Sequence, residues 1–435
     1  MKFYSTNNKQ MQVSFREAVL KGIADDGGLF MPNEIPKLPE SFFKNIEKYS
    51  FQEIGFEVAK LFIDDINEID LHRIINKAIS FPAPLVRLSE NISVLELFHG
   101  PTLAFKDFGA QFLANLIEFY LKEEEKETLI LVATSGDTGS AVANGFYEKK
   151  GIKVALLYPS GKVSKTQEQQ LTTLDKNIFA FEVKGVFDDC QRLVKQAFHD
   201  TDLKNIFSMT SANSINIARL LPQSFYYFEA YKQIKDKSLP FVISVPSGNF
   251  GNLTAGLIAQ FMGLPIAKFI AAVNANDIFP NYLDSGKYEP KDSVQTISNA
   301  MDVGNPSNFA RIISLFGNDV DSIRNKISSS SYSDEQTLSA IKEVKKQFGY
   351  TIDPHGAVGY LALKKYLQQS GQTNVNAVIL ETAHPSKFSE TVDEVLKEKT
   401  TMPQRLSACL EKEKRSVLTQ KDYASFKEAL IKTIT

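Results

Sequence analysis

A lysine at the start of a predicted helix is the first residue whose type and position suggest chemistry. Lys106 precedes apolar residues at helical spacing, namely Phe108, Phe112, Leu116 and Tyr120. Because the helix dipole disfavours positive charge at this end, a lysine there is better neutral, and a neutral amine can form an imine with an aldehyde. The alternative is a surface lysine paired with Asp107, and the spacing alone favours that alternative.

Two glycine-rich turns each follow a short apolar segment and open a predicted helix. One spans residues 135–139 and reads Ser-Gly-Asp-Thr-Gly, and the other spans residues 246–252. Backbone N–H groups at such turns can bind a carboxylate or a phosphate. Either turn could instead be purely structural, with Asp137 or Thr138 capping the helix that follows the first. The second turn lacks the spacing of nucleotide-binding loops, so a nucleotide is not indicated.

A polar segment at residues 211–219 could bind a doubly charged anion. Asn213, Ser214 and Asn216 offer amides and a hydroxyl, and Arg219 offers planar paired donors. The alternative is a helix N-terminus capped by Asn213 or Ser214 beside a solvated arginine, and the segment by itself favours that alternative.

The segment at residues 381–388 follows the last predicted strand of the chain. Its Thr382 hydroxyl would point from the end of that strand into a crevice. We interpret His384, which precedes a proline, as a structural histidine rather than an acid or a base.

Alternating strands and helices are predicted to position these residues. Apolar segments 128–133 and 241–245 read as buried strands, each followed by a turn and a helix, over 140–149 and 252–262. Further candidate strands lie at 154–157, 179–183, 269–273 and 377–380. This alternation predicts parallel sheets covered on both faces, with ligands bound beyond the carboxyl ends of the strands.

Two other regions differ from this pattern. Residues 1 to about 80 show helical apolar spacing, for example at Phe15, Val19 and Ile23, and are interrupted by glycines and prolines over 25–39. The serine-rich segment 328–333 is predicted to be a surface loop.

Composition excludes several classes of protein. The chain has 435 residues, 43% hydrophobic and 23% charged, with a net charge of −2, so no overall field favours nucleic acid or a membrane surface. Cys190 and Cys409 lack the spacing of a disulfide framework or of a metal site. The first residues lack signal-peptide features, and no apolar run approaches the ~20 residues of a membrane helix. We therefore expect a cytoplasmic protein.

Taken in order, these segments resemble those of threonine synthases, in the branch of bacterial and fungal enzymes with an extended N-terminal domain. The resemblance runs the whole length of the chain, through segments 4–6, 24–30, 98–107, 133–139, 158–164, 211–219, 248–252 and 382–388. Much of the wider superfamily has asparagine where Asp137 stands, and alanine is frequent at the position of Ser386.

The resemblance implies an α/β fold of the fold type II class of pyridoxal-phosphate (PLP) enzymes. Two doubly wound parallel-sheet domains would hold PLP in the cleft between them, beside a mostly helical N-terminal domain. The implied boundaries are 1–84 for the N-terminal domain, 85–235 for the small domain and 236–435 for the large domain.

The resemblance also implies the site residues. Lys106 would form the Schiff base with PLP, and Asp137 would lie beside the cofactor. Thr382 would contact the pyridine nitrogen. The other implied ligands are Gly248, Asn249, Phe250, Gly251 and Asn252 for the cofactor phosphate, Ser135, Gly136 and Thr138 for the substrate carboxylate, and Asn213, Ser214, Asn216, Arg219 and Lys162 for the substrate phosphate.

The implied activity is that of a carbon–oxygen lyase acting on phosphates. It would convert O-phospho-L-homoserine and water into L-threonine and phosphate, by γ-elimination and β-addition of water, as the last step of threonine biosynthesis. We expect no metal, no nucleic acid and no membrane partner, and a monomer or a homodimer. The alternatives are another PLP lyase, such as a threonine or serine dehydratase or a phospholyase for another phosphorylated amine, and a non-catalytic binding protein. A dehydratase needs no site for a substrate phosphate.

Overall fold

Two mainly parallel sheets form the core of the computed structural model, which describes residues 1–122, 126–134 and 136–434. The larger sheet has the order β12-β11-β10-β13-β5-β4, and only the β4–β5 pair at its edge is antiparallel. Its strands are β4 (Leu85–Arg87), β5 (Ile92–Glu96), β10 (Phe241–Pro246), β11 (Ile266–Val273), β12 (Ile327–Ser331) and β13 (Asn376–Glu381).

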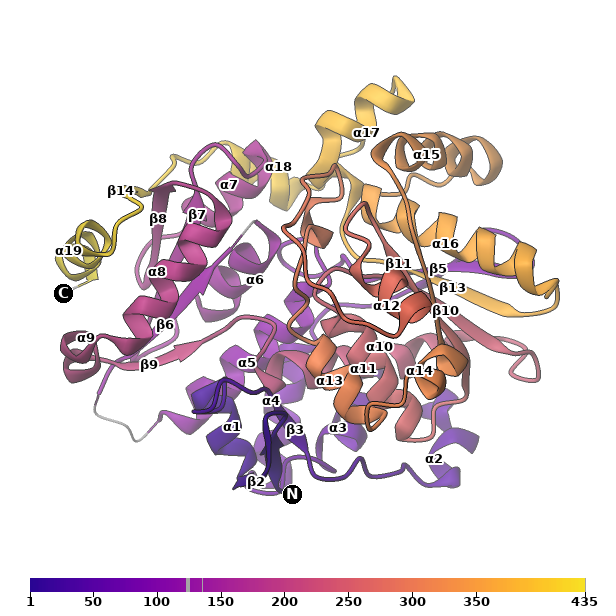
Figure 1. Ribbon diagram of the computed structural model, residues 1–435, viewed down its shortest axis with the longest axis horizontal. Helices are drawn as coiled ribbons and strands as arrows, with labels where there is room; N and C mark the ends of the chain where they lie inside the picture. Colours follow the sequence, from indigo (N-terminus) through magenta and orange to yellow (C-terminus); the bar gives the residue numbers. More distant parts are fainter. Residues whose placement is uncertain (123–125, 135, 435) are drawn as a thin grey trace.

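The second sheet is entirely parallel and has the order β14-β8-β7-β6-β9. Its strands are β6 (Thr128–Ala133), β7 (Ile152–Pro159), β8 (Ile178–Lys184), β9 (Ser208–Ser211) and β14 (Val417–Gln420). The six strands predicted from apolar segments are confirmed as β6, β7, β8, β10, β11 and β13. Figure 1 shows the two sheets beside each other, with the N-terminal segment beneath them.

Helices cover both sheets, and α10 packs against both α5 and α11 near the centre of the molecule. Buried apolar residues on these helices join the core that also contains strand residues of both sheets. The helices after the N-terminal segment are α5 (Lys106–Tyr120), α6 (Asp137–Phe146), α7 (Lys165–Thr172), α8 (Phe187–His199), α9 (Thr201–Ile206), α10 (Ile217–Gln233), α11 (Gly251–Phe261), α12 (Ile278–Ser285), α13 (Phe309–Leu315), α14 (Val320–Lys326), α15 (Asp334–Phe348), α16 (Pro354–Ser370), α17 (Ser389–Leu396), α18 (Gln404–Leu410) and α19 (Tyr423–Ile434), with 3₁₀ turns η2 (Asn299–Met301) and η3 (Pro385–Phe388). No helix in the described ranges is long and apolar enough to cross a membrane.

The sheets do not follow the contiguous boundaries expected at 85 and 236. Strands β4 and β5 lie in the same sheet as β10 to β13, because β5 pairs with β13 along its whole length. Strand β14 crosses back and pairs with β8, and α19 packs against α8. Each sheet therefore combines segments that are far apart in the sequence.

The N-terminal segment contains helices, as predicted, and also a small antiparallel sheet that the apolar spacing did not reveal. The sheet order is β2-β1-β3. Ile23 is 39% exposed, because α1 ends at Lys21 and Gly22 turns the chain with a φ of 73°. The elements are β1 (Phe3–Ser5), β2 (Asn8–Val13), α1 (Phe15–Lys21), β3 (Phe30–Pro32), α2 (Glu40–Lys44), η1 (Ile46–Lys48), α3 (Phe51–Ala59) and α4 (Glu68–Ala78).

The prediction of a surface loop at 328–333 is wrong for most of that segment. Residues up to Ser331 form β12, which pairs in parallel with β11 at the edge of the larger sheet. The Ser329 hydroxyl donates a hydrogen bond of 2.7 Å to the Ala271 carbonyl. Edge strands tolerate such polar side chains, so composition alone misled the prediction.

Candidate active site

Lys106 is the first residue of α5, and its side chain is only 16% exposed. Its Nζ atom lies 3.8 Å from Oδ2 of Asp137, the first residue of α6. Burial lowers the pKa of Lys106, the negative charge of Asp137 opposes this effect, and the positive charges of Lys387 and Arg219 lower the pKa further. The alternative of a surface lysine paired with Asp107 is therefore wrong. The amine has the surroundings that favour its neutral form.

Asp137 is buried and is held by two further side chains. Its Oδ1 atom accepts hydrogen bonds from Lys387 Nζ at 2.7 Å and from Gln167 Nε2 at 3.1 Å. Burial raises the pKa of Asp137, but attraction to Lys387 and Lys106 outweighs burial and leaves this pKa well below its ordinary value. Asp137 is thus a buried carboxylate shared by two lysines.

The turn before α6 is closed by Thr134. Its Oγ1 atom accepts hydrogen bonds from the N–H groups of Gly136 and Gly139, at 3.0 and 2.8 Å. Gly136 has a φ of 137°, and a Cβ atom there would lie 2.5 Å from Cδ of Gln167, so only glycine fits. Gly136 stands at the N-cap and makes no side-chain cap, so Asp137 and Thr138 lie within the helix. Ser135 falls outside the described residues.

The second turn leads from β10 into α11 through a strained residue. Phe250 caps α11 with a left-handed backbone, at a φ of 58°. A Cβ atom on Gly248 would lie 2.6 Å from Cα of Met301, so the turn is packed closely against η2. Asn252 Oδ1 accepts hydrogen bonds from the hydroxyls of Tyr226 and Tyr227, while its buried Nδ2 has no hydrogen-bond partner among the described residues.

The second turn meets the polar segment 211–219 directly. Asn249 Nδ2 donates a hydrogen bond of 2.7 Å to Ser214 Oγ. Asn249 is itself fixed from the other side, because its Oδ1 accepts from Ser307 N at 2.6 Å and its carbonyl accepts from Asn308 Nδ2 at 3.0 Å. The two segments, each predicted separately to bind an anion, are therefore in direct contact.

Arg219 points inward and is 1% exposed, so the alternative of a solvated arginine is wrong. Its Nη1 donates a hydrogen bond of 2.5 Å to the Ala212 carbonyl, and its buried Nε has no hydrogen-bond partner among the described residues. Burial lowers the pKa of Arg219 to about 10, although the negative charge of Asp107 opposes the shift. The guanidinium is still charged at neutral pH and has a donor to spare for an anion.

Asn216 does not have the free donors that a ligand would need. It is fully buried and caps α10, with Oδ1 accepting from Ala218 N at 3.0 Å. Its Nδ2 donates to the carbonyls of Val19, at 2.8 Å, and Ser211, at 3.4 Å. Asn216 therefore positions the polar segment, and its predicted place at the substrate phosphate stays a prediction.

The remaining predicted residues have different exposures. Asn213 and Ser214 are half-buried, whereas Lys162 is exposed on the turn after β7. Thr382 is buried directly after β13, and its carbonyl accepts a hydrogen bond of 2.8 Å from Phe105 N. This bond ties the end of β13 to the residue that precedes Lys106.

Comparison with known proteins identifies the family. Residues 80–381 match the family model described as pyridoxal-phosphate dependent enzyme, residues 2–79 match threonine synthase N terminus, and residues 356–430 match threonine synthase, C-terminal. A threonine synthase from Haemophilus influenzae is 43% identical, with 100% of both chains covered. The chain belongs to the threonine synthase family.

Solved threonine synthase structures share the whole architecture. The crystal structure of the Escherichia coli enzyme superposes with a TM-score of 0.91, at 40% identity and with 100% of both chains covered. A PLP-bound threonine synthase from Brucella melitensis superposes with a TM-score of 0.92, at 33% identity, covering 99% of this chain and 98% of that one. The fold type II architecture and the PLP cofactor expected from the sequence are confirmed.

The site fits the cofactor of the threonine synthase family. PLP needs a poorly solvated lysine and a pocket for its phosphate, and this site offers buried Lys106 together with the N-terminus of α11. The unpartnered Nδ2 of Asn252 lies at that helix N-terminus and can donate to a phosphate oxygen. Among the site residues that the structure describes, no group contradicts PLP binding.

Three supporting side chains were missed by the sequence analysis. Lys387 belongs to the segment that contains Thr382 and His384, and its position a few residues after a buried strand is the signal that could have identified it. Gln167 and His355 had no such signal. Gln167 lies against Gly136, and His355 Nε2 accepts a hydrogen bond of 3.3 Å from the N–H of Ala300 in η2.

His384 has the structural role predicted for it. Its Nδ1 lies 2.7 Å from Ser386 Oγ, and the side chain caps η3. Burial lowers the pKa of His384 to about 4, against the opposing charge of Glu96. The imidazole is neutral at physiological pH.

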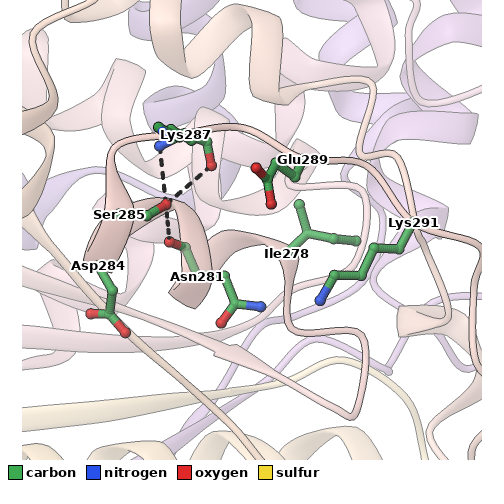
Figure 2. Close-up of a pocket in the computed structure, with 7 residues that line it drawn as sticks. All are labelled: Ile278, Asn281, Asp284, Ser285, Lys287, Glu289 and Lys291. Atoms are coloured by element: carbon green, nitrogen blue, oxygen red, sulfur yellow. Dashed lines mark hydrogen bonds between the residues drawn. The ribbon is translucent and has the colours of Figure 1, made fainter.

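A pocket of about 270 Å³ on the surface lies apart from these residues (Figure 2). Figure 2 shows Ser285 Oγ bonded to its own helix and to the following loop. None of the predicted site residues that the structure describes lines this pocket, which is bounded by Ile278, Asn281, Asp284, Ser285, Lys287, Glu289 and Lys291.

Proposed function

We propose that this member of the threonine synthase family converts O-phospho-L-homoserine and water into L-threonine and phosphate, the last step of threonine biosynthesis. The hydrogen bond between Asn249 and Ser214 carries the proposal, because it joins two anion-binding segments at one site. PLP brings one phosphate, so the second segment suits a substrate that is itself phosphorylated. A threonine or serine dehydratase does not need this second segment, because its substrate carries no phosphate.

Lys106 is the proposed catalytic residue. PLP supplies electron withdrawal from the α-carbon of the substrate when it is bound. The neutral amine of Lys106 attaches the cofactor and then removes and returns the proton at that carbon. Its burial near Lys387 and Arg219 supports this role, since desolvation and these two positive charges lower the pKa of the amine.

The cofactor contacts fall on the segments around Lys106. We assign the cofactor phosphate to Gly248, Asn249, Phe250, Gly251 and Asn252, and the pyridine nitrogen to Thr382. A hydroxyl at that nitrogen does not force it to be protonated, which moderates the electron withdrawal. Asp137 lies beside the cofactor as a charged carboxylate.

The substrate is held at both ends. We assign its carboxylate to Ser135, Gly136 and Thr138, and its phosphate to Asn213, Ser214 and Arg219, with Lys162 at the rim. Arg219 offers a desolvated charge and a spare N–H, which supports the assignment. Retaining the departed phosphate keeps the site closed to other reactions while water adds at the β-carbon.

A comparison of two substrates tests the proposal. The purified protein with PLP should release phosphate from O-phospho-L-homoserine and form an equal amount of L-threonine. Incubation with L-threonine alone should yield no more than traces of ammonia and oxobutyrate. Deamination of threonine without phosphate release would identify a dehydratase instead, and inactivity on both substrates, despite bound PLP, would favour a binding protein.

A matched pair of variants distinguishes loss of a substrate-phosphate contact from a general loss of structure. Arg219→Gln should raise KM for O-phospho-L-homoserine by at least ~10-fold, because a charged hydrogen bond to the phosphate is worth roughly 1.5–3 kcal/mol. Arg324→Gln removes an arginine from an ion pair on α14 and should leave KM unchanged. Equal effects of both variants would contradict the assignment.

We also propose a cytoplasmic location and a monomer or homodimer. Both cysteines, Cys190 and Cys409, are free thiols, which suits a reducing compartment. Sedimentation of the purified protein tests the assembly state, and fractionation of cells tests the location.

A further inference from the structure

Lys387 is a second buried lysine at the candidate active site. It lies in η3, after β13, and is 1% exposed. Its Nζ binds Asp137 Oδ1 at 2.7 Å and donates a hydrogen bond of 2.9 Å to the Thr102 carbonyl. Asp137 belongs to α6, which follows β6 of the five-stranded sheet, so this ion pair links the two sheets.

Two lysines compete for the carboxylate of Asp137. Lys387 binds one oxygen at 2.7 Å, whereas Lys106 stands 3.8 Å from the other. Coulomb attraction falls with distance, and only the shorter contact is also a charge-assisted hydrogen bond. Asp137 therefore interacts more strongly with Lys387 than with Lys106.

The other charged groups near Asp137 do not stabilise the charged form of Lys106. Arg219 on α10 adds positive charge, and His355 on α16 lies near enough to influence Asp137. Asp107 on α5 is buried, and its two oxygens accept hydrogen bonds from Thr102 N and Oγ1, at 2.8 and 2.7 Å. Burial raises the pKa of Asp107 to about 6, so it is charged at neutral pH, but it is not among the groups that shift the pKa of Lys106.

We propose that Lys387 is a positioning residue for cofactor attachment, which holds Asp137 so closely that the carboxylate cannot keep Lys106 in its charged form. The inference rests on the proposed attachment of PLP to Lys106. In that step the Lys106 nitrogen forms a double bond to the aldehyde carbon of PLP. The aldehyde oxygen leaves as water with the two hydrogens of the neutral amine, so only the neutral amine can react.

A purely structural role for Lys387 predicts a different result. If the Lys387–Asp137 pair only joined the two sheets, its loss would lower stability and leave the pH dependence of Lys106 unchanged. If Lys387 governs the charge of Lys106, its replacement by a neutral residue must move that pH dependence upward.

The test measures cofactor attachment to the full-length chain after removal of PLP. PLP is added back over a range of pH, and the rate of attachment is followed by visible absorbance and by borohydride trapping. In Lys387→Met the midpoint of the pH–rate curve should rise by about one pH unit, because a nearby like charge has been removed. Asp137→Asn should lower the midpoint by a similar amount, and Lys387→Arg should return it toward the wild-type value.

Lys364→Met is the matched control. Lys364 pairs with Glu343 at 2.6 Å, away from the site, so its loss should leave the midpoint in place. Thermal unfolding of every variant identifies any that fail to fold. An unchanged midpoint in folded Lys387→Met would overturn the proposal.

Two further variants make each outcome decisive. If Lys387→Met does not fold, an unchanged or raised midpoint in Asp137→Asn overturns the inference. Lys106→Ala should abolish trapping at every pH. Trapping that persists in Lys106→Ala would refute the proposed role of Lys106 itself, whatever Lys387 does.

Discussion

Asn216 Nδ2 donates a hydrogen bond of 2.8 Å to the backbone carbonyl of Val19. This bond ties the first residues of α10, which carry Arg219, to α1 of the N-terminal segment. Arg311 repeats the connection, since its buried guanidinium donates to the carbonyls of Phe30, at 3.0 Å, and Ile215, at 2.7 Å. The N-terminal segment thus supports the proposed substrate-phosphate site directly.

Asn216→Ala should affect both stability and substrate binding. The variant loses a helix cap and leaves the buried Val19 carbonyl unpaired, which should cost about 2–3 kcal/mol of unfolding free energy and raise KM for O-phospho-L-homoserine. Asn67→Ala is the control, because Asn67 caps α4 by the same kind of bond, to Asp70 N. It should cost about 1 kcal/mol and leave KM unchanged. Urea unfolding and steady-state kinetics check both variants, and equal KM values would contradict the role given to Asn216.

Gly136→Ala should disable the turn before α6. A methyl group there meets Gln167 at 2.5 Å and strains a backbone with a φ of 137°. Displacement of the turn by about 1 Å should lower kcat/KM by roughly 100-fold. Gly151→Ala also places a methyl group on a residue with a positive φ, 71°, but meets nothing within 4 Å, so its activity should be retained. A comparable loss in both variants would assign the effect to strain alone.

Asn252→Asp should weaken PLP binding. The unpartnered Nδ2 would be replaced by an acidic oxygen at the N-terminus of α11, where it would repel a phosphate group. We expect the dissociation constant of PLP to rise at least ~10-fold, which corresponds to about 1.4 kcal/mol. Asn67→Asp changes the same residue type at a distant helix and should bind PLP normally. Fluorescence titration with PLP measures both constants.

His384 should make the protein sensitive to acid between pH 6.5 and about 4. Burial lowers the pKa of His384 in the folded state, so acid protonates the unfolded chain first and favours unfolding as the pH falls through this window. Above pH 6.5 the effect vanishes. The thermal unfolding midpoint should therefore fall less in His384→Gln than in the wild type on acidification through this window. An identical fall in both proteins would show that His384 does not titrate there.

Local patterns predicted the parts of the fold that repeat over a few residues. The units built on β6 and β10 combine a buried apolar strand, a glycine-rich turn and a helix, and each of these signals is contained in a continuous segment. The pairing of β5 with β13, and of β14 with β8, depends on hydrogen bonds between distant segments. No periodicity encodes those partners.

The candidate site shows the same division. Lys106 and Arg219 lie in recognisable segments, whereas Arg311 lies among ordinary apolar residues of α13 and carries no motif. Arg311 is fully buried because carbonyls from β3 and from residue 215 converge on it with Asn308 Oδ1. For Asn216 the sequence could not reveal the capping role, because a capping asparagine and a ligand asparagine look alike until their partners are known.

Strand β5 also has a consequence for the order in which a ribosome delivers this chain. Residues 92–96 leave the ribosome early, yet their partner β13, at residues 376–381, emerges only after most of the protein has been made. Until then β5 presents an unpaired, largely apolar edge, the kind of surface that associates with other nascent chains. We expect that synthesis in cells depends on chaperones that shield this edge during translation.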